Sequence, residues 1–132
     1  MSTNLTAFKR IWELSKDSPY MAKIDNPDFA FSGDNAVCGD WMELAFRMHK
    51  DGSTKLTTGK IAEARFLHTG CAVSAVAASV LMEYAEGKTL DEVRKVTPEE
   101  QLKLFGAPVS PARIKCALLP LEVLKMDPKK KR

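Results

Sequence analysis

The chain has 132 residues, 45% of them hydrophobic and 28% charged, which is enough for one globular domain over residues 1–132 but not for two. Its net charge is +3, and the basic segment 129–132 (KKKR) supplies more than all of it, so the rest lacks the clustered basic surface of a nucleic-acid-binding protein. No apolar run approaches the roughly 20 residues that cross a bilayer, and the N-terminus lacks a signal-peptide pattern. We therefore expect a cytoplasmic protein that contacts neither nucleic acid nor membrane.

The first predicted element is an amphipathic helix over residues 4–15, lying on the core. Its apolar stripe consists of Leu5, Phe8, Ile11 and Trp12. Prolines, a glycine and short apolar pieces follow over residues 18–34, and they predict a loop with one short strand at 29–31.

A β-hairpin is predicted over residues 42–68. Apolar residues alternate with polar ones from Met42 to Met48, which is the period of a half-buried strand, and residues 60–68 continue in the same style. The turn signals Asp51-Gly52 and Thr58-Gly59 lie between the two segments, so we expect a hairpin with a long, mobile tip over residues 50–60.

The second half of the chain predicts helices. Residues 72–85 (AVSAVAASVLMEYA) are apolar on nearly every face, which is typical of a central, buried helix that Gly87 ends. Two capping boxes follow, at Thr89 with Glu92 and at Thr97 with Glu100, and each marks the start of a further helix.

The last predicted helix begins after Ser110 and Pro111 and reaches about residue 126. Pro120 interrupts its pattern, so the helix either bends near Cys116 or starts later. The basic tail 127–132 has no apolar content and predicts a frayed, solvated end, with a partner-docking patch as the alternative. Strands precede helices without alternating with them. The predicted fold is α+β: a small antiparallel sheet of about three strands with helices packed on one face.

The three cysteines occupy different predicted settings: Cys38 precedes a strand, Cys71 starts the buried helix and Cys116 lies near Pro120. An odd number of cysteines without an export signal favours reduced thiols. Their spacing alone does not indicate a zinc site. The alternative to metal ligation is that the cysteines are core or incidental residues. A helix N-terminus favours the thiolate form of Cys71, however, and thiolates act as ligands and nucleophiles.

Three separate stretches carry a family resemblance: NAVCGDW at 35–41, ARFLHTGCAVSAVAASVLMEYAEGKTLDEV at 64–93 and PARIKCALLPLEVL at 111–124. Together they resemble the signature regions of the NifU/IscU/SufU family of iron-sulfur cluster assembly scaffolds. The joint occurrence of the three is specific, whereas any one alone is weak.

The resemblance implies a compact α+β domain that gathers its ligands at one solvent-accessible end. By motif position the ligands are Cys38, Asp40, Cys71 and Cys116, which would hold a labile [2Fe-2S] cluster built from iron and persulfide sulfur. The implied partners are a cysteine desulfurase and acceptor apoproteins, and the implied role is that of a scaffold or carrier rather than an enzyme. A carboxylate holds iron or zinc less firmly than a thiolate does, so Asp40 is a natural place for such a site to open.

The sequence also departs from the family pattern. Lys115 stands before the last cysteine, where IscU-type members have a histidine, and this feature resembles the SufU branch, which implies a zinc-dependent sulfurtransferase as the second hypothesis. The interval of 45 residues between Cys71 and Cys116 nevertheless leaves little room for the insertion that SufU members carry there. The chaperone-docking motif of IscU is replaced by GAPVSPA at 106–112, and the usual pattern near Pro27 is missing. A structural zinc domain is the third hypothesis.

Three further residues are candidates at the site. Lys115 is expected to be a cation beside the ligands that relieves their mutual repulsion, with a lysine on a helix surface as the alternative. His68 is a candidate ligand because it lies close to Cys71 in sequence, against an ordinary strand-edge histidine, and His49 is expected to face solvent. The sequence leaves the oligomeric state open, a homodimer included.

Overall fold

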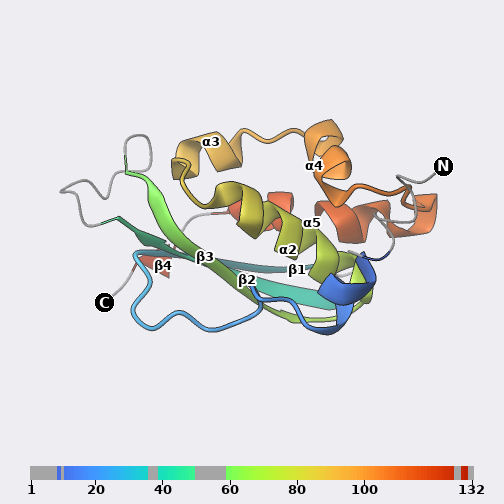
Figure 1. Cartoon of the computed structure of the whole chain (residues 1–132), viewed down its shortest axis with the longest axis horizontal. Coiled ribbons are helices and arrows are strands. Elements are labelled where there is room, and N and C mark those ends of the chain that lie inside the picture. Colours follow the sequence, from blue (N-terminus) through green and yellow to red (C-terminus); the bar gives the residue numbers. More distant parts are fainter. Residues whose placement is uncertain (1–8, 10, 36–38, 50–58, 127–128, 131–132) are drawn as a thin grey trace.

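The fold was analysed in a computed structural model, which describes residues 9, 11–35, 39–49, 59–126 and 129–130. A twisted antiparallel sheet forms one layer, and α-helices cover one of its faces (Figure 1). The strands are β1 (Phe29–Asn35), β2 (Asp40–Met48), β3 (Ile61–Thr69) and β4 (Lys129–Lys130), in the spatial order β3-β2-β1-β4. The helices are α2 (Ala72–Ala85), α3 (Leu90–Arg94), α4 (Pro98–Phe105) and α5 (Ile114–Leu124). The predicted α+β class, with helices on one face, is confirmed.

The strand β2 has the alternation that the sequence predicts. Met42, Leu44, Phe46 and Met48 are all buried, while the residues between them are partly exposed. Antiparallel pairing with β3 sets Leu44 opposite Phe66, so the apolar side chains of both strands lie on the face that the helices cover. The predicted tip over residues 50–60 falls mostly outside the described residues.

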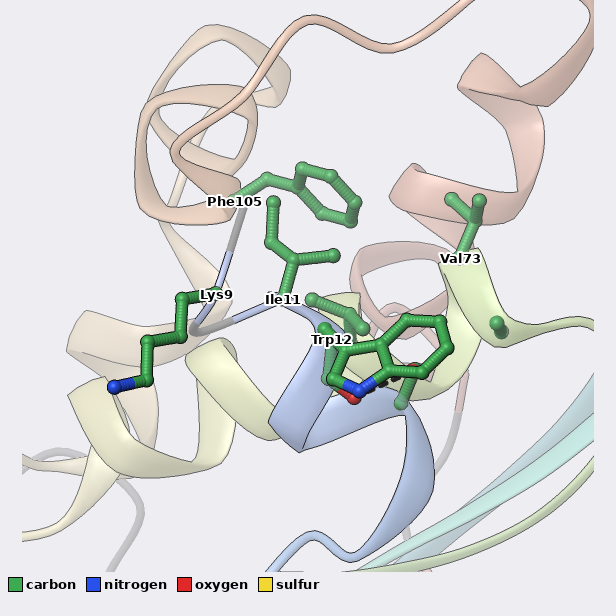
Figure 2. Close-up of a pocket in the computed structure, with 8 residues that line it drawn as sticks. Lys9, Ile11, Trp12, Val73 and Phe105 are labelled. Atoms are coloured by element: carbon green, nitrogen blue, oxygen red, sulfur yellow. Dashed lines mark hydrogen bonds between the residues drawn. The ribbon is translucent and has the colours of Figure 1, made fainter. Parts of the chain in front are cut away.

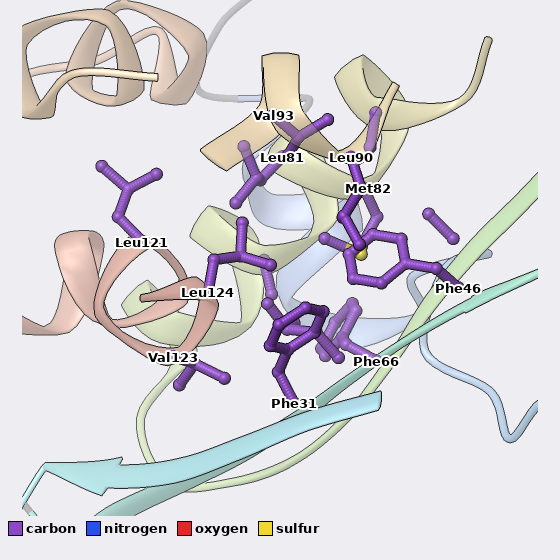
Figure 3. Close-up of a cluster of buried hydrophobic side chains, with 14 of the residues drawn as sticks. Phe31, Phe46, Phe66, Leu81, Met82, Leu90, Val93, Leu121, Val123 and Leu124 are labelled. Atoms are coloured by element: carbon purple, nitrogen blue, oxygen red, sulfur yellow. The ribbon is translucent and has the colours of Figure 1, made fainter. Parts of the chain in front are cut away.

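The helix α2 has the predicted bounds and is buried along most of its length. Small residues dominate it, which lets α2 lie close to both β3 and α5. Leu81 and Met82 of α2 pack with Phe31 and Phe46 of the sheet in a single core, completed by side chains of α3 and α5 (Figure 3). Each such fully buried side chain contributes about 1.5–3 kcal/mol of hydrophobic stabilisation.

Both predicted capping boxes are present. Thr89 accepts a hydrogen bond from the Glu92 N–H at 3.1 Å, and Glu92 accepts one from the Thr89 N–H at 3.0 Å. Thr97 and Glu100 repeat the arrangement at the start of α4. Of the two alternatives for the last helix, the later start is observed: residues Pro111–Arg113 form a 3-10 turn, and α5 begins at Ile114 and contains Pro120.

The structure corrects two predictions about the chain ends, the second of them only for residues 129–130. Trp12 was expected on the core, but its side chain is 62% exposed, and the helix over residues 11–16 packs instead through Ile11 and Leu14. The basic tail was expected to be frayed, but β4 pairs with Phe29 and Ala30. The unpaired backbone groups at the edge of β1 explain this pairing. Leu5 and Phe8 lie outside the described residues.

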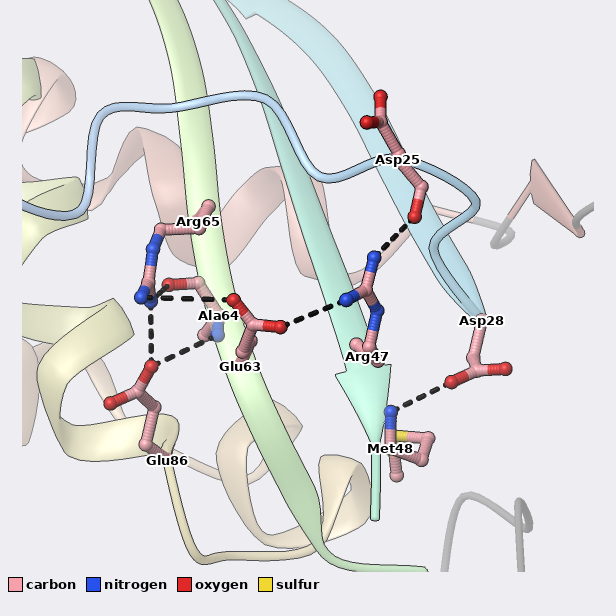
Figure 4. A network of polar contacts seen from close by, with 8 residues as sticks. All are labelled: Asp25, Asp28, Arg47, Met48, Glu63, Ala64, Arg65 and Glu86. Atoms are coloured by element: carbon pink, nitrogen blue, oxygen red, sulfur yellow. Dashed lines mark hydrogen bonds and ion pairs between the residues drawn. The ribbon is translucent and has the colours of Figure 1, made fainter. Parts of the chain in front are cut away.

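The segment that precedes β1 crosses the face of the sheet that the helices leave open. It pairs with the free edge of β3 through the Ala22 N–H and the Phe66 carbonyl and then reaches β1 (Figure 4). Arg47 of β2 donates to the carbonyl of Asp25 in this segment and also bonds Glu63 of β3 at 3.1 Å. Extended chain therefore covers the edge of β3, and β4 covers part of the edge of β1. None of the described helices has the length and apolar character needed to span a bilayer.

Candidate metal or cluster site

Three elements bring potential ligands to one end of the fold. Asp40 is the first residue of β2, Cys71 immediately precedes α2 and Cys116 lies in the first turn of α5. One ligand atom of each, a carboxylate oxygen or a sulfur, lies within 4.8 Å of those of the other two. Residues remote in the sequence therefore converge on a volume that a metal ion or a small cluster would fill.

The placement of these side chains follows from local structure. Asp40 has the same strand parity as Met42 and Leu44, so its carboxylate faces the helices and is only 2% exposed. Cys116 shares the buried face of α5 with Leu119 and is fully buried, whereas Cys71 is half-buried. The resemblance implied a solvent-accessible ligand set; among the described ligands, Cys71 is the most accessible.

Asp40 and Cys71 are joined by two hydrogen bonds. The Cys71 N–H donates to Asp40 Oδ1 at 3.1 Å, and the Cys71 thiol donates to Asp40 Oδ2 at 3.3 Å. The first bond caps the N-terminus of α2 from another element, because the Cys71 side chain itself makes no capping bond. The carboxylate thus holds the thiol in place in the metal-free protein.

Gly70 makes the approach of Asp40 to Cys71 sterically feasible. Its φ is +145°, a value that L side chains rarely adopt, and a Cβ at this position would lie 2.1 Å from Asp40 Oδ1. Trp41 pairs with Thr69, so the register of β2 with β3 brings Asp40 beside Gly70. The glycine before the cysteine therefore has a definite structural role.

The electrostatics of the site favour an ionised Asp40. Burial raises the pKa of Asp40, but hydrogen bonds from the Cys71 side chain and N–H, from Ser74 and from Cys116 outweigh burial and lower the pKa below its ordinary value. A carboxylate and two thiols suit zinc or iron, both of which bind thiolates and carboxylates in proteins. The donor set on the described residues therefore fits such a guest.

His68 lies beside the ligands rather than among them. Its Nε2 atom is 2.6 Å from the hydroxyl of Ser74, a fully buried residue of α2. Burial lowers the pKa of His68, and the negative charge of Asp40 partly opposes this shift. Sequence reasoning missed Ser74, although its position three residues after Cys71, in the first turn of a helix, is where a hydroxyl can bond back to the cysteine.

The other candidates are placed as follows. Cys38 lies outside the described residues, so its position in the site stays a prediction. Lys115 is exposed and directly precedes Cys116, and His49 is exposed, as expected from its strand parity.

An apolar groove adjoins the site. It has a volume of about 540 Å³ and runs between the helical residues 11–16, the first turns of α2 and the end of α4 (Figure 2). Trp12 and Val73 contribute to its walls, and the ammonium of Lys16 lies 4.1 Å from the centre of the Trp12 ring. The side chain that was expected in the core therefore lines a surface near Cys71.

Comparison with known proteins agrees with this geometry. The model of the family described as NifU-like N terminal domain matches residues 19–130, which is most of the chain. The chain belongs to this family. The match confirms the family resemblance that the three sequence motifs indicate.

Known relatives match two thirds or more of the chain. The domain is 32% identical over 89 residues to "Iron-sulfur cluster assembly protein 2" of Arabidopsis thaliana, covering 67% of this chain and 49% of that protein. It is 27% identical over 105 residues to "Iron-sulfur cluster assembly scaffold protein IscU 1" of Archaeoglobus fulgidus, covering 80% of this chain and 63% of that protein. The chain thus spans about half the length of the plant relatives that it matches.

Solved structures share the fold. A protein of Fervidobacterium islandicum AW-1, described as a candidate iron-sulfur cluster assembly scaffold for the SUF system, superposes with a TM-score of 0.70 at 27% identity, covering 89% of this chain and 92% of that chain. The N-terminal part of a NifU-like protein from Brucella abortus superposes with a TM-score of 0.65 at 19% identity, covering 88% and 87% of the two chains. The second likeness concerns the fold alone.

Proposed function

We propose that this NifU-like domain is a scaffold on which a labile [2Fe-2S] cluster is assembled and from which it is passed to acceptor proteins. The observation that carries the proposal is the convergence of Asp40, Cys71 and Cys116 within 4.8 Å. Cys38 is proposed as the fourth ligand from its place in the Cys-Gly-Asp motif. The cluster is cargo here, so a site that both holds and releases it is required.

The arrangement of Asp40 and Cys71 supports a site that can open. Cluster binding requires both thiols as thiolates and therefore breaks the bond from the Cys71 thiol to Asp40 Oδ2. When the cluster leaves, the same bond can form again and restabilise the empty site. Four thiolates would suit permanent storage better than this mixed set does.

A second candidate function is sulfur transfer. In this alternative the same groups bind Zn²⁺, and one thiolate leaves the metal to accept a persulfide from a cysteine desulfurase. The observation that favours it is Lys115 in place of the histidine of IscU-type members. In both cases the proposed partners are a cysteine desulfurase and apoproteins that receive sulfur or cluster.

Anaerobic purification followed by iron, zinc and acid-labile sulfide analysis tests the proposal. Iron and sulfide in equal amounts, bound by the wild-type protein and lost in Cys71→Ala, is the result expected of a scaffold. Zinc without sulfide, together with stimulation of a desulfurase, would favour sulfur transfer and overturn the first proposal.

Lys115 is proposed to stabilise the loaded site electrostatically. Three thiolates and a carboxylate carry four negative charges, and a [2Fe-2S]²⁺ core or Zn²⁺ neutralises only two of them. Because the Lys115 side chain is exposed, solvent and salt screen its effect. We expect Lys115→Ala to weaken metal binding a few-fold at low salt and less at high salt.

The matched control is Lys125→Ala, which removes an exposed lysine at the other end of α5. Ten residues of helix place Lys125 about 15 Å from Lys115, which exceeds the Debye length at physiological salt. Competitive titration with a chromophoric chelator measures both variants. If Lys115→Ala leaves metal affinity and sulfur acceptance unchanged, the proposed role of Lys115 is wrong.

A further inference from the structure

The hydroxyl of Ser74 is the centre of a buried hydrogen-bond chain beside the proposed ligands. Ser74 is fully buried, and its Oγ lies 3.0 Å from the Cys71 carbonyl oxygen, to which it donates, and 2.6 Å from His68 Nε2. Its oxygen is also 3.8 Å from the Cys71 sulfur. The chain links a strand residue to the turn that carries the thiol.

The number of protons in this hydrogen-bond network bears on the direction of its shortest bond, the one between Ser74 and His68. A serine hydroxyl has one proton to donate. The Cys71 carbonyl takes that proton, and the other oxygen that Ser74 bonds, in the Asp40 carboxylate, is likewise an acceptor. When Ser74 donates to either of these oxygens, it has no proton left for His68, and Nε2 is then the donor of the bond between them.

We propose that His68 is a positioning residue that donates from Nε2–H to Ser74 and so holds the Cys71 turn in the geometry that binds metal. A neutral Nε2–H imidazole and an imidazolium both make this donation, and only the Nδ1–H tautomer cannot. The proposal therefore rests on the contacts and not on the charge of His68.

The hydrogen-bond network holds the backbone of Cys71 in place, whereas its thiol can change partners. The N–H of Cys71 is bound by Asp40 at 3.1 Å, and its carbonyl is bound by Ser74 at 3.0 Å. The peptide groups on both sides of the sulfur are therefore fixed, while the sulfur itself can exchange its bond to Asp40 for a metal. Preorganisation of this kind raises metal affinity. Removal of a side chain that hydrogen-bonds a metal ligand typically lowers the affinity 10–100-fold.

His68 is itself well held. Its ring is half-buried and makes an edge-to-face contact with Phe66, with ring centres 6.4 Å apart. Both residues are on β3, which pairs with the strand that supplies Asp40. The orientation of the imidazole thus comes from the sheet, and it reaches the Cys71 turn through Ser74 and through a hydrogen bond from His68 to the Cys71 backbone.

The first test needs no substitution. Nitrogen-15 NMR of the metal-free wild-type protein distinguishes protonated from unprotonated imidazole nitrogens, and we expect a protonated Nε2 with a slowly exchanging hydrogen. In Ser74→Ala that hydrogen should exchange faster. A wild-type His68 protonated at Nδ1 alone would overturn the proposal, and so would direct coordination of Nε2 in the Co²⁺-loaded protein.

The second test uses a conservative rescue and measures affinity for Co²⁺, whose absorption reports thiolate ligation. His68→Phe keeps the aromatic contact with Phe66 but has no donor, and we expect about tenfold weaker binding. His68→Gln keeps an N–H donor and should stay within about threefold of wild type. If His68→Phe binds as wild type does, or His68→Gln is as impaired as His68→Phe, the positioning role is wrong.

The affinity test rests on the proposed metal-binding function, whereas the NMR test does not. If the wild-type protein failed to bind Co²⁺ while Nε2 proved to be the donor, the proposed function would fail and the hydrogen-bond assignment would stand. Circular dichroism of each variant separates a loss of affinity from a loss of fold.

Discussion

At the scale of single residues, the site depends on a position that carries no functional group. Gly70 has a positive φ and lies against Asp40, so a methyl group there would occupy the space of the carboxylate. We predict that Gly70→Ala displaces Asp40, breaks both of its bonds to Cys71 and lowers Co²⁺ affinity at least tenfold. Competitive titration measures the affinity, and urea unfolding measures the accompanying loss of stability.

Gly87→Ala is the matched control. Gly87 also has a positive φ, +88°, but a Cβ there would have no atom within 4 Å. Both variants therefore carry backbone strain, on the order of 1 kcal/mol, and only Gly70→Ala adds the clash. Equal effects of the two substitutions on Co²⁺ affinity would show that close packing at Gly70 does not shape the site.

At the scale of elements, the short helices α3 and α4 depend on their capping boxes. Hydrogen bonds from the Thr97 N–H and side chain lower the pKa of Glu100, so the folded protein binds a proton at this carboxylate less readily than the unfolded chain does. This stabilisation is fully present above the ordinary glutamate pKa. It is lost as the pH falls through the lowered pKa of the folded state.

We predict that Glu100→Gln removes this part of the acid sensitivity. Glutamine can still accept the bond from the Thr97 N–H, but it does not titrate. The stability advantage of wild type over the variant should therefore shrink as the pH is lowered from neutral into the acidic range. Urea unfolding midpoints at a series of pH values check this, and a difference that stays constant with pH would contradict it.

Local signals explain which elements the sequence predicts well. The alternation in residues 42–48, the small apolar run of 72–85 and the two capping boxes are all local patterns, and each corresponds to an observed element. The edge strand β4 has no such pattern, because its pairing depends on β1, which is remote in the sequence. Trp12 likewise fits the apolar stripe but is exposed. The periodicity of the stripe does not predict how much of that helix face the neighbouring helices cover.

The site was predictable to a similar degree. The family motifs single out Asp40, Cys71 and Cys116, and strand parity alone places Asp40 on the buried face. The contribution of Ser74 was missed because a serine within a run of small residues is already explained by close packing of the helix. Only the three-dimensional contact with His68 gives it a direction and a role.

At the scale of the whole molecule, the core and the site are largely separate. The main core lies between the sheet and the helices and consists of apolar residues; Asp40 and Cys71 lie outside it, and Cys116 is buried beside it on the face of α5 that carries Leu119. A chain of this size can fold on such a core without a metal. The site instead joins the ends of β2, α2 and α5, where a metal would add stability to an existing fold.

We therefore predict that chelation leaves the protein folded and that metal only raises its stability. Zn²⁺ at 100 times its dissociation constant should raise the free energy of unfolding by about 2.7 kcal/mol, and EDTA should return it to the metal-free value without loss of the circular dichroism of the native state. Cys71→Ala should abolish the increase, whereas His49→Gln, which removes an exposed imidazole, should retain it. In a structural zinc domain the metal supplies the folding free energy, so unfolding on chelation would favour that alternative over a carrier.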